Sequence, residues 1–244
     1  MHEIMQWEGA ELVLRKNTVD RANVEWMGTS VFARSFRNID VPDHAPVLDL
    51  GAHIGSFAVM AASISPCRVL AFEPDPASAR LCRVNAMLNN MEARITCHEV
   101  AVAGSTGKTT FFESTENWGH TIIFSGGPYN VLTGRTSEVD VLSLADALVH
   151  CGAERCAFMK FNIEGAEFDM FESAGVDVLR RIDMMVGEIH FDIGAHKADG
   201  IVNRLAEAGF RTKLIPEGAH RAILVAEQLA SKSKRRGLWA WLTS

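Results

Sequence analysis

Short apolar runs alternate with amphipathic stretches from residue 46 onward. Residues 46–51 and 68–75 read PVLDLG and RVLAFEPD, compact apolar runs that end in acids or glycine, as buried strands do. Residues 56–63 and 77–90 have the apolar spacing of helices, and residues 93–102 predict a third strand. Strands that alternate with helices at this spacing predict parallel βαβ units.

The alternation resumes in the second half of the chain. Apolar runs predict strands at residues 157–165 and 183–191, helices at 166–174 and 200–209, and an antiparallel pair of strands at 210–216 and 221–227. The five parallel strands and the closing pair together predict an α/β fold with a mostly parallel seven-stranded sheet and helices on both faces.

Three further segments flank or interrupt this predicted domain, which we place at residues 46–228. Residues 1–45, with a short strand at 11–15 and a helix at 24–37, form a lead-in that packs on the main domain. Residues 104–137 are rich in glycine and predict a β-rich insert of hairpins or an active-site flap. Residues 229–244 form a basic and then aromatic tail.

Composition narrows the function classes. The 244 residues carry a net charge of -6, which disfavours a nucleic-acid partner, because phosphate binding needs a concentrated basic surface. The sequence has no signal peptide and no run of about 18 apolar residues, so we expect no membrane span. Its five cysteines form no CxxC pair, as is usual for reduced thiols, and we expect a cytoplasmic protein.

The loop after the first strand of this domain is the first candidate for a cofactor site. It reads Asp49-Leu50-Gly51-Ala52-His53-Ile54-Gly55, a DxGxxxG pattern that differs from the GxGxxG of dinucleotide sites. A pyrophosphate needs backbone N–H groups with no carboxylate nearby, whereas S-adenosylmethionine (SAM) carries a cationic ammonium and sulfonium. We therefore expect Asp49 to help hold a cationic cofactor and Gly51, Ala52 and Gly55 to turn closely past it.

The next two strand ends extend this site. Glu73 lies 24 positions after Asp49 and is followed by Pro74; a carboxylate there can accept both ribose hydroxyls. Glu99, Val100 and Ala101 follow the third strand, where the fold would place an adenine between apolar side chains and one hydrogen-bonding group.

Several of these segments together resemble the FkbM family of SAM-dependent methyltransferases. The resemblance runs from about residue 46 to 192 through VLDLGAHIGSFAVMAA, AFEPDPASARLCRVNAMLNN, HEVAVAGSTGKTTFF, MKFNIEGAEFDMFE and EIHFD, and it extends to the Thr-Val-Asp of residues 18–20. The most specific piece is Lys160-Phe161-Asn162-Ile163-Glu164-Gly165. The family typically has Lys-x-Asp-x-Glu-Gly there, so Asn162 keeps a hydrogen-bond acceptor but lacks the family's charge.

The resemblance implies a Rossmann-like class I methyltransferase fold, SAM as cofactor and transfer of a methyl group, usually to an oxygen of a sugar, polyketide or related metabolite. We therefore expect a small-molecule or glycan acceptor and no nucleic acid. Oxygen or nitrogen as the acceptor atom stays open, and so does the oligomeric state, a homo-oligomer included.

Methyl transfer to a hydroxyl needs in-line alignment and removal of a proton. The catalytic candidates are Glu164 and Asn162 after the fourth strand and His190 near the tip of the fifth, on the same face as Glu188. The candidates for substrate binding are His120 and Trp118 in the insert and Glu167 at a helix start. No ligand spacing predicts a metal site.

Two other functions compete with methyl transfer. An NAD(P)-dependent oxidoreductase would use the same α/β fold, but the absent GxGxxG and the position of Asp49 count against it. A non-catalytic SAM-fold module is favoured by Asn162 alone, while Asp49, Gly51, Gly55, Glu73 and Glu164 favour retained cofactor binding.

Overall fold

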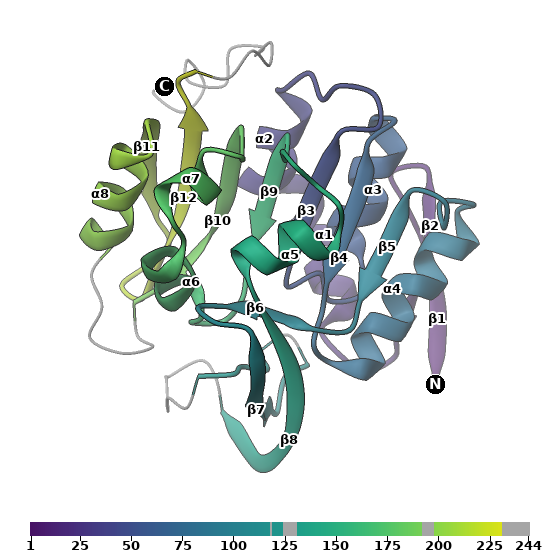
Figure 1. Cartoon of the computed structure of the whole chain (residues 1–244). Helices are drawn as coiled ribbons and strands as arrows, with labels where there is room; N and C mark the ends of the chain where they lie inside the picture. The colour runs from purple at the N-terminus through teal and green to yellow at the C-terminus, as the bar shows by residue number, and fades with distance from the viewer. Residues whose placement is uncertain (118, 124–130, 192–197, 231–244) are drawn as a thin grey trace.

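The computed structural model describes residues 1–117, 119–123, 131–191 and 198–230 and is built around a seven-stranded sheet (Figure 1). The strands lie in the order β11 (Phe210–Pro216), β12 (Arg221–Gln228), β10 (Met184–His190), β9 (Phe158–Phe161), β3 (Pro46–Leu50), β4 (Arg68–Phe72) and β5 (Ile95–His98). From β10 to β5 all neighbours are parallel, and β12 pairs antiparallel with both β10 and β11. The predicted mostly parallel sheet with an antiparallel pair at its C-terminal edge is confirmed.

Helices cover both faces of this sheet, as predicted (Figure 1). One face packs against α1 (Asp20–Thr29), α2 (Val31–Arg37), α3 (Ser56–Ile64) and α4 (Pro76–Leu88), and the other against α5 (Leu144–His150), α6 (Glu167–Ser173), α7 (Val176–Leu179) and α8 (Asp199–Glu207). Successive strand residues join opposite cores; Val47 faces the first group of helices and Leu48 the second. Because Val47 and Leu48 are both fully buried although they face opposite sides of the sheet, the sequence of β3 is a continuous apolar run.

The insert and the residues on either side of it form a second, three-stranded sheet of β6 (Ala101–Ala103), β8 (Leu132–Ser143) and β7 (Gly107–Ser114). The antiparallel β7 and β8 form the predicted hairpin, which extends away from the body at the lower edge of Figure 1. The predicted strand at residues 93–102 is wrong as one element. It breaks after His98, so β5 stays in the large sheet and β6 pairs with β8 in the small one.

The lead-in also differs from the expectation in detail. The predicted helix at residues 24–37 is two helices, because Ser30 adopts an extended backbone and its hydroxyl caps α2 by accepting from the Ala33 N–H. The predicted strand at 11–15 is β2 (Ala10–Arg15), paired with an unpredicted β1 (His2–Trp7).

Two asparagines of α4 attach β2 to the main domain. Asn85 Oδ1 accepts from the Val13 N–H at 2.7 Å, and Asn89 Oδ1 accepts from the Glu11 N–H at 2.9 Å. Asn85 is fully buried, and its amide also donates to the Ile54 carbonyl. These bonds satisfy backbone groups on one edge of the hairpin and fix the lead-in against α4, so that Arg15 and Asp20 come to the edge of the large sheet.

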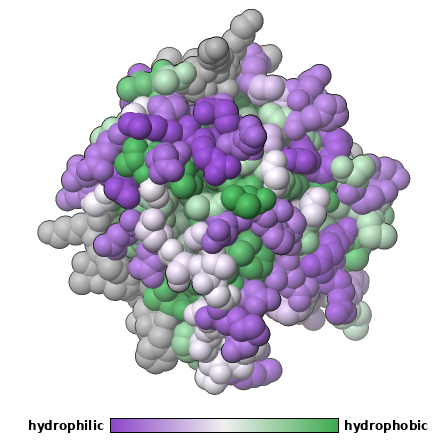
Figure 2. Space-filling model, in the orientation of Figure 1, coloured by the Kyte–Doolittle hydropathy of each residue, from purple (hydrophilic) through white to green (hydrophobic). Residues whose placement is uncertain are grey.

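Apolar and polar side chains are interspersed over the face shown in Figure 2. Within the described part of the chain, none of the helices combines the length and the apolar character needed to cross a bilayer.

Gly187 provides a test of the packing between β9 and β10. A Cβ atom there would lie 2.2 Å from the ring of Phe161, its neighbour in the parallel register. We expect Gly187→Ala to lower the free energy of unfolding by about 1–3 kcal/mol, because neither strand can move in a filled core. Urea unfolding measures this loss.

Gly200 supplies the matched control, since a Cβ atom at that position in α8 meets nothing within 4 Å. Gly200→Ala should leave stability unchanged or raise it by up to about 1 kcal/mol. Equal losses in the two variants would contradict the proposed contact.

Candidate functional site

A cavity of about 490 Å³ lies at the carboxyl ends of β3, β4, β9 and β10. Ligands of open α/β sheets bind at this end, so it is the candidate functional site. The predicted site residues on its wall are Gly51, Ala52, Glu73, Pro74, Ala101, His120, Asn162 and Glu164. The sheet therefore brings together residues that lie more than 110 positions apart in the chain.

Other predicted residues are not on this wall, namely Asp49, Gly55, Glu99, Val100, Glu167 and His190. Trp118 lies outside the described residues. The wall also contains residues absent from the predicted set: Trp26, Asn117, Lys160, Glu188 and Arg221. The alternation of β10 placed Glu188 on the face of His190 and could have identified it, whereas the other positions depend on tertiary packing.

Asp49 is fully buried and pairs with Lys160 on the neighbouring strand β9. Its Oδ1 lies 3.0 Å from Lys160 Nζ, which also donates to the Gly51 carbonyl at 2.7 Å. Burial raises the pKa of Asp49, and the lysine charge opposes that rise. The expected direct contact between Asp49 and a cationic cofactor does not fit this geometry, because Lys160 stands on the cavity wall and Asp49 behind it.

The loop after β3 needs glycine at two positions. Gly51 has a φ of +71°, and a Cβ atom there would lie 1.8 Å from the Asn162 carbonyl oxygen. Gly55 has a φ of +83°, precedes α3 and faces Cys82, whose sulfur would lie 2.7 Å from a Cβ atom. A side chain at either position would push apart the strand ends or helices that enclose the cavity.

Glu73 accepts hydrogen bonds from the backbone of two loops, the one after β3 and the one after β4. Its Oε2 accepts from the His53 N–H at 2.7 Å and its Oε1 from the Asp75 N–H at 2.9 Å. Burial raises the pKa of Glu73 to about 7, although both N–H groups lower it. Each carboxylate oxygen keeps a further lone pair for a hydroxyl group. Asp75 caps α4, with its carboxylate accepting from the Ser78 N–H.

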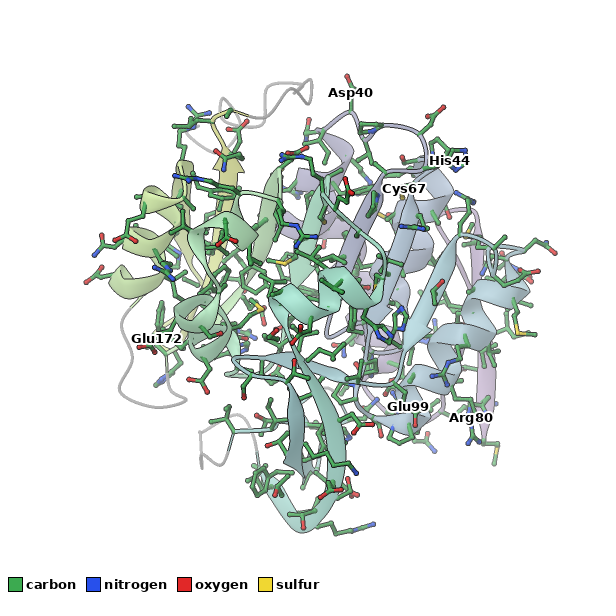
Figure 3. The ribbon with its side chains drawn as sticks, viewed as in Figure 1. Asp40, His44, Cys67, Arg80, Glu99 and Glu172 are labelled. Carbon is green, nitrogen blue, oxygen red and sulfur yellow. The ribbon has the colours of Figure 1, made fainter. Side chains whose placement is uncertain are left out.

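The segment after β5 contributes fewer residues to the cavity wall than predicted. Ala101 lies on the cavity wall, while Val100 is buried in the core between the large sheet and α5 to α8. Glu99 pairs with Arg83 at 3.2 Å and lies at the outer surface, near Arg80 in Figure 3. Glu99 is therefore not on the cavity wall, and a contact between its carboxylate and an adenine stays a prediction.

Arg15 and Asp20 of the lead-in form a polar network at the cavity edge. Arg15 Nε lies 3.0 Å from Asp20 Oδ2, and Arg15 Nη2 lies 2.8 Å from His53 Nε2. Asn117 of the insert donates to Asp20 Oδ1. Burial alone would raise the pKa of Asp20, but the bonds from Arg15 lower it on balance. Burial lowers the pKa of His53 to about 4, so its imidazole is neutral at pH 7.

Three carboxylates surround His190 beside the cavity. His190 Nδ1 lies 3.0 Å from Glu167 Oε1, and Nε2 lies 3.6 Å from Glu164 Oε2 and 3.5 Å from Glu188 Oε2. Burial would lower the pKa of His190, but the charges of Glu167 and Glu164 raise it well above its usual value. Glu164 and Glu188 lie on the cavity wall, whereas His190 and Glu167 lie behind them.

The insert closes over this carboxylate group. Thr121 Oγ1 donates to the Glu164 carbonyl at 2.6 Å, which ties the insert to the turn after β9. His120 lies on the wall, its Nδ1 accepts from the Ser114 N–H at 2.9 Å, and burial lowers its pKa. These residues of the insert therefore form part of the cavity wall.

The ion pair between Asp49 and Lys160 can be tested by a double-mutant cycle. We expect Lys160→Met to lower the free energy of unfolding by about 3–5 kcal/mol, because it leaves a buried carboxylate without its partner. Adding Asp49→Asn should recover part of that loss, since no buried charge remains. Losses from the two single variants that simply add in the double variant would contradict the pairing.

Residues 49–212, about two thirds of the chain, match the family model described as the methyltransferase FkbM domain. A search of curated protein sequences finds none that matches.

Among solved structures, a putative rRNA methylase from Clostridium thermocellum has 9% sequence identity and a TM-score of 0.51, over 89% of this chain and 99% of that one. A putative transferase from Pyrococcus horikoshii has 13% identity and a TM-score of 0.50, over 93% of this chain and 70% of that one. At such identities the likeness concerns the fold alone, and it confirms the predicted class I methyltransferase fold. The chain belongs to the FkbM methyltransferase family, whose cofactor is S-adenosylmethionine.

Proposed function

We propose that this methyltransferase transfers the methyl group of SAM to a hydroxyl oxygen of a small metabolite, sugar or natural product. One observation carries the proposal: Gly51 and Glu73 line the same cavity as Glu164 and Glu188. The first pair suits a nucleoside cofactor, and the second offers acceptors for a hydroxyl proton.

The cofactor lies along the loops after β3 and β4 in this proposal. Glu73 accepts from the ribose hydroxyls with the lone pairs that its two backbone N–H partners leave unused. Gly51 and Ala52, where the backbone can approach closely, would hold the methionine part, and Pro74 and Ala101 would border the adenine. SAM supplies an electrophilic methyl group on a sulfonium.

Glu164 is the proposed general base, with His190 and Glu167 as the groups that position it. The acceptor oxygen attacks the methyl carbon, its proton passes to the Glu164 carboxylate, and the carbon–sulfur bond breaks with its electron pair left on sulfur. The products are the methyl ether and S-adenosylhomocysteine. Asn162, on the same wall, orients the acceptor through its amide and takes no proton.

The charge of the wall supports a small neutral acceptor over a nucleic acid. Glu164 and Glu188 face the acceptor side, and the chain as a whole carries a net charge of -6. Carboxylates accept from hydroxyl groups and repel phosphates. His120 and Trp26, also on the wall, give the acceptor an apolar or aromatic surface to pack against.

An acceptor screen tests the proposed reaction class. The full chain is incubated with SAM carrying a labelled methyl group and, separately, with pools of sugars, hydroxylated natural products, amines and total RNA. We expect label in a hydroxylated pool, in a linkage stable as a methyl ether. Label in RNA or in amines would overturn the proposed acceptor, and cofactor binding without transfer to any pool would favour a non-catalytic module.

Glu73 provides a pH test of cofactor placement. Because its pKa is raised to about 7, the carboxylate form grows from pH 6 to pH 8, and S-adenosylhomocysteine should bind up to about tenfold more tightly over that range. Glu73→Gln should bind more weakly and lose this slope, as measured by calorimetric titration.

The glutamine variant also controls for ionisation of the ligand itself, which would persist in it. The exposed Glu172, at the outer edge of α6 in Figure 3, gives a matched control. Glu172→Gln should keep both affinity and slope. A slope that survives in Glu73→Gln would contradict the assigned ribose contact.

Glu164→Gln tests the proposed base. Once an acceptor is known, turnover should fall by about 10²–10⁴, because the amide cannot take the proton. Binding of S-adenosylhomocysteine should stay within about threefold, since Glu73 and not Glu164 contacts the cofactor. Glu172→Gln again serves as the control, and normal turnover in Glu164→Gln would remove this residue from the mechanism.

A further inference from the structure

We propose that Glu164, Glu188 and His190 bind a divalent metal ion at the acceptor side of the cavity. These residues come from the turn after β9 and from β10, and one ligand atom from each lies within 4.8 Å of the other two. Sequence spacing predicted no such site, because the three residues combine only when β9 and β10 lie side by side. The ion binding itself does not depend on the proposed acceptor.

The distances between the three ligand atoms suit one shared ion. His190 Nε2 lies 3.5 Å from Glu188 Oε2 and 3.6 Å from Glu164 Oε2. Two ligands on neighbouring positions of an octahedral ion at about 2.1 Å lie roughly 3 Å apart. Side-chain shifts of about half an ångström therefore bring Nε2 and each carboxylate oxygen to that spacing, and the ligand atoms of the two carboxylates lie within 4.8 Å of each other. Two carboxylates and one imidazole suit Mn²⁺.

The hydrogen bond on the far side of the imidazole orients His190 as metal-binding histidines usually are. Glu167 Oε1 lies 3.0 Å from His190 Nδ1, so Nδ1 carries the hydrogen and Nε2 points at the two cavity carboxylates. Glu167 is itself fully buried and held by the N–H groups of Ile163 and Gly165. The ring is thus fixed by a group that does not take part in coordination.

Charge and hydrogen bonding on the same wall also favour a cation. Three buried carboxylates face one imidazole. The half-exposed Arg221 lies 3.8 Å from Glu188 Oε1, and the charge of Lys160 also acts on Glu188. Asn162 Oδ1, a buried oxygen of the cavity wall, has no hydrogen-bond partner among the residues that the structure describes. A divalent ion with bound water would offset the negative charge and offer donors to such an oxygen.

The position of the ion gives it a role in the proposed reaction, and this part of the inference rests on the proposed function. Glu164 and Glu188 border the cavity, so the remaining coordination positions face the space for the acceptor. A hydroxyl oxygen bound there becomes more acidic and is held in line with the methyl group. In this arrangement Glu164 both binds the ion and takes the hydroxyl proton.

Mn²⁺ binding to the full chain tests the site directly. The protein is stripped with a chelator and titrated with Mn²⁺, and free ion is measured by electron paramagnetic resonance. We expect one ion per chain with micromolar affinity, and Glu188→Gln and His190→Gln should each weaken it at least about tenfold. Glu167→Gln, which removes the orienting carboxylate, should weaken binding by about 10–100-fold.

Controls separate loss of the site from loss of the fold. Glu172→Gln should bind Mn²⁺ like the unchanged chain, and each variant must still bind S-adenosylhomocysteine. No binding of Mn²⁺ by the unchanged chain, or equal binding by all variants, would overturn the metal site and leave the proposed methyl transfer intact. Conversely, one specific Mn²⁺ per chain without transfer to any acceptor would uphold the site and overturn the proposed function.

Discussion

The ammonium group of Lys160 holds together the two strand ends on which the cavity depends. It pairs with Asp49, donates to the Gly51 carbonyl and lies in the parallel register opposite Asp49, so β3 and β9 end at the same level. That level allows the backbone of Asn162 to pass directly over Gly51. A buried charge pair is costly to desolvate, and the contacts of this one hold the two strand ends in their crossing.

The loop after β3 begins at this crossing, and its position determines where several other side chains of the site lie. After Gly51 the chain turns so that the His53 N–H points at Glu73, which fixes the carboxylate at the end of β4. The same turn presents His53 to Arg15 of the lead-in and to Asn117 of the insert. Segments about a hundred positions apart thereby meet over one edge of the cavity. The lead-in is thus part of the site. The hydrogen bonds from two asparagines of α4 to β2 hold it in this position.

The large sheet was predictable because burial on both faces leaves a continuous apolar run in each parallel strand, which the order of residues records directly. Predictions failed where the chain changes direction without a glycine or proline. Ser30 divides the helix predicted at residues 24–37, and Glu99 separates β5 from β6. The helix is divided by a capping hydroxyl, and the strand by a change of pairing partner. The periodicity of apolar residues predicts neither feature.

The sequence by itself determined the fold class, the family and the backbone of the cofactor loop, because apolar periodicity and the DxGxxxG and KxNxEG segments are properties of neighbouring residues. It also placed Glu73 and Glu164 at strand ends, where they border the cavity. Only the tertiary structure decided where the other acids point. Asp49 turns to Lys160, Glu99 turns to the surface, and Glu188 joins Glu164 and His190. A side chain's partner depends on which strands lie adjacent and on what remains buried between them, and no spacing along one chain encodes that adjacency.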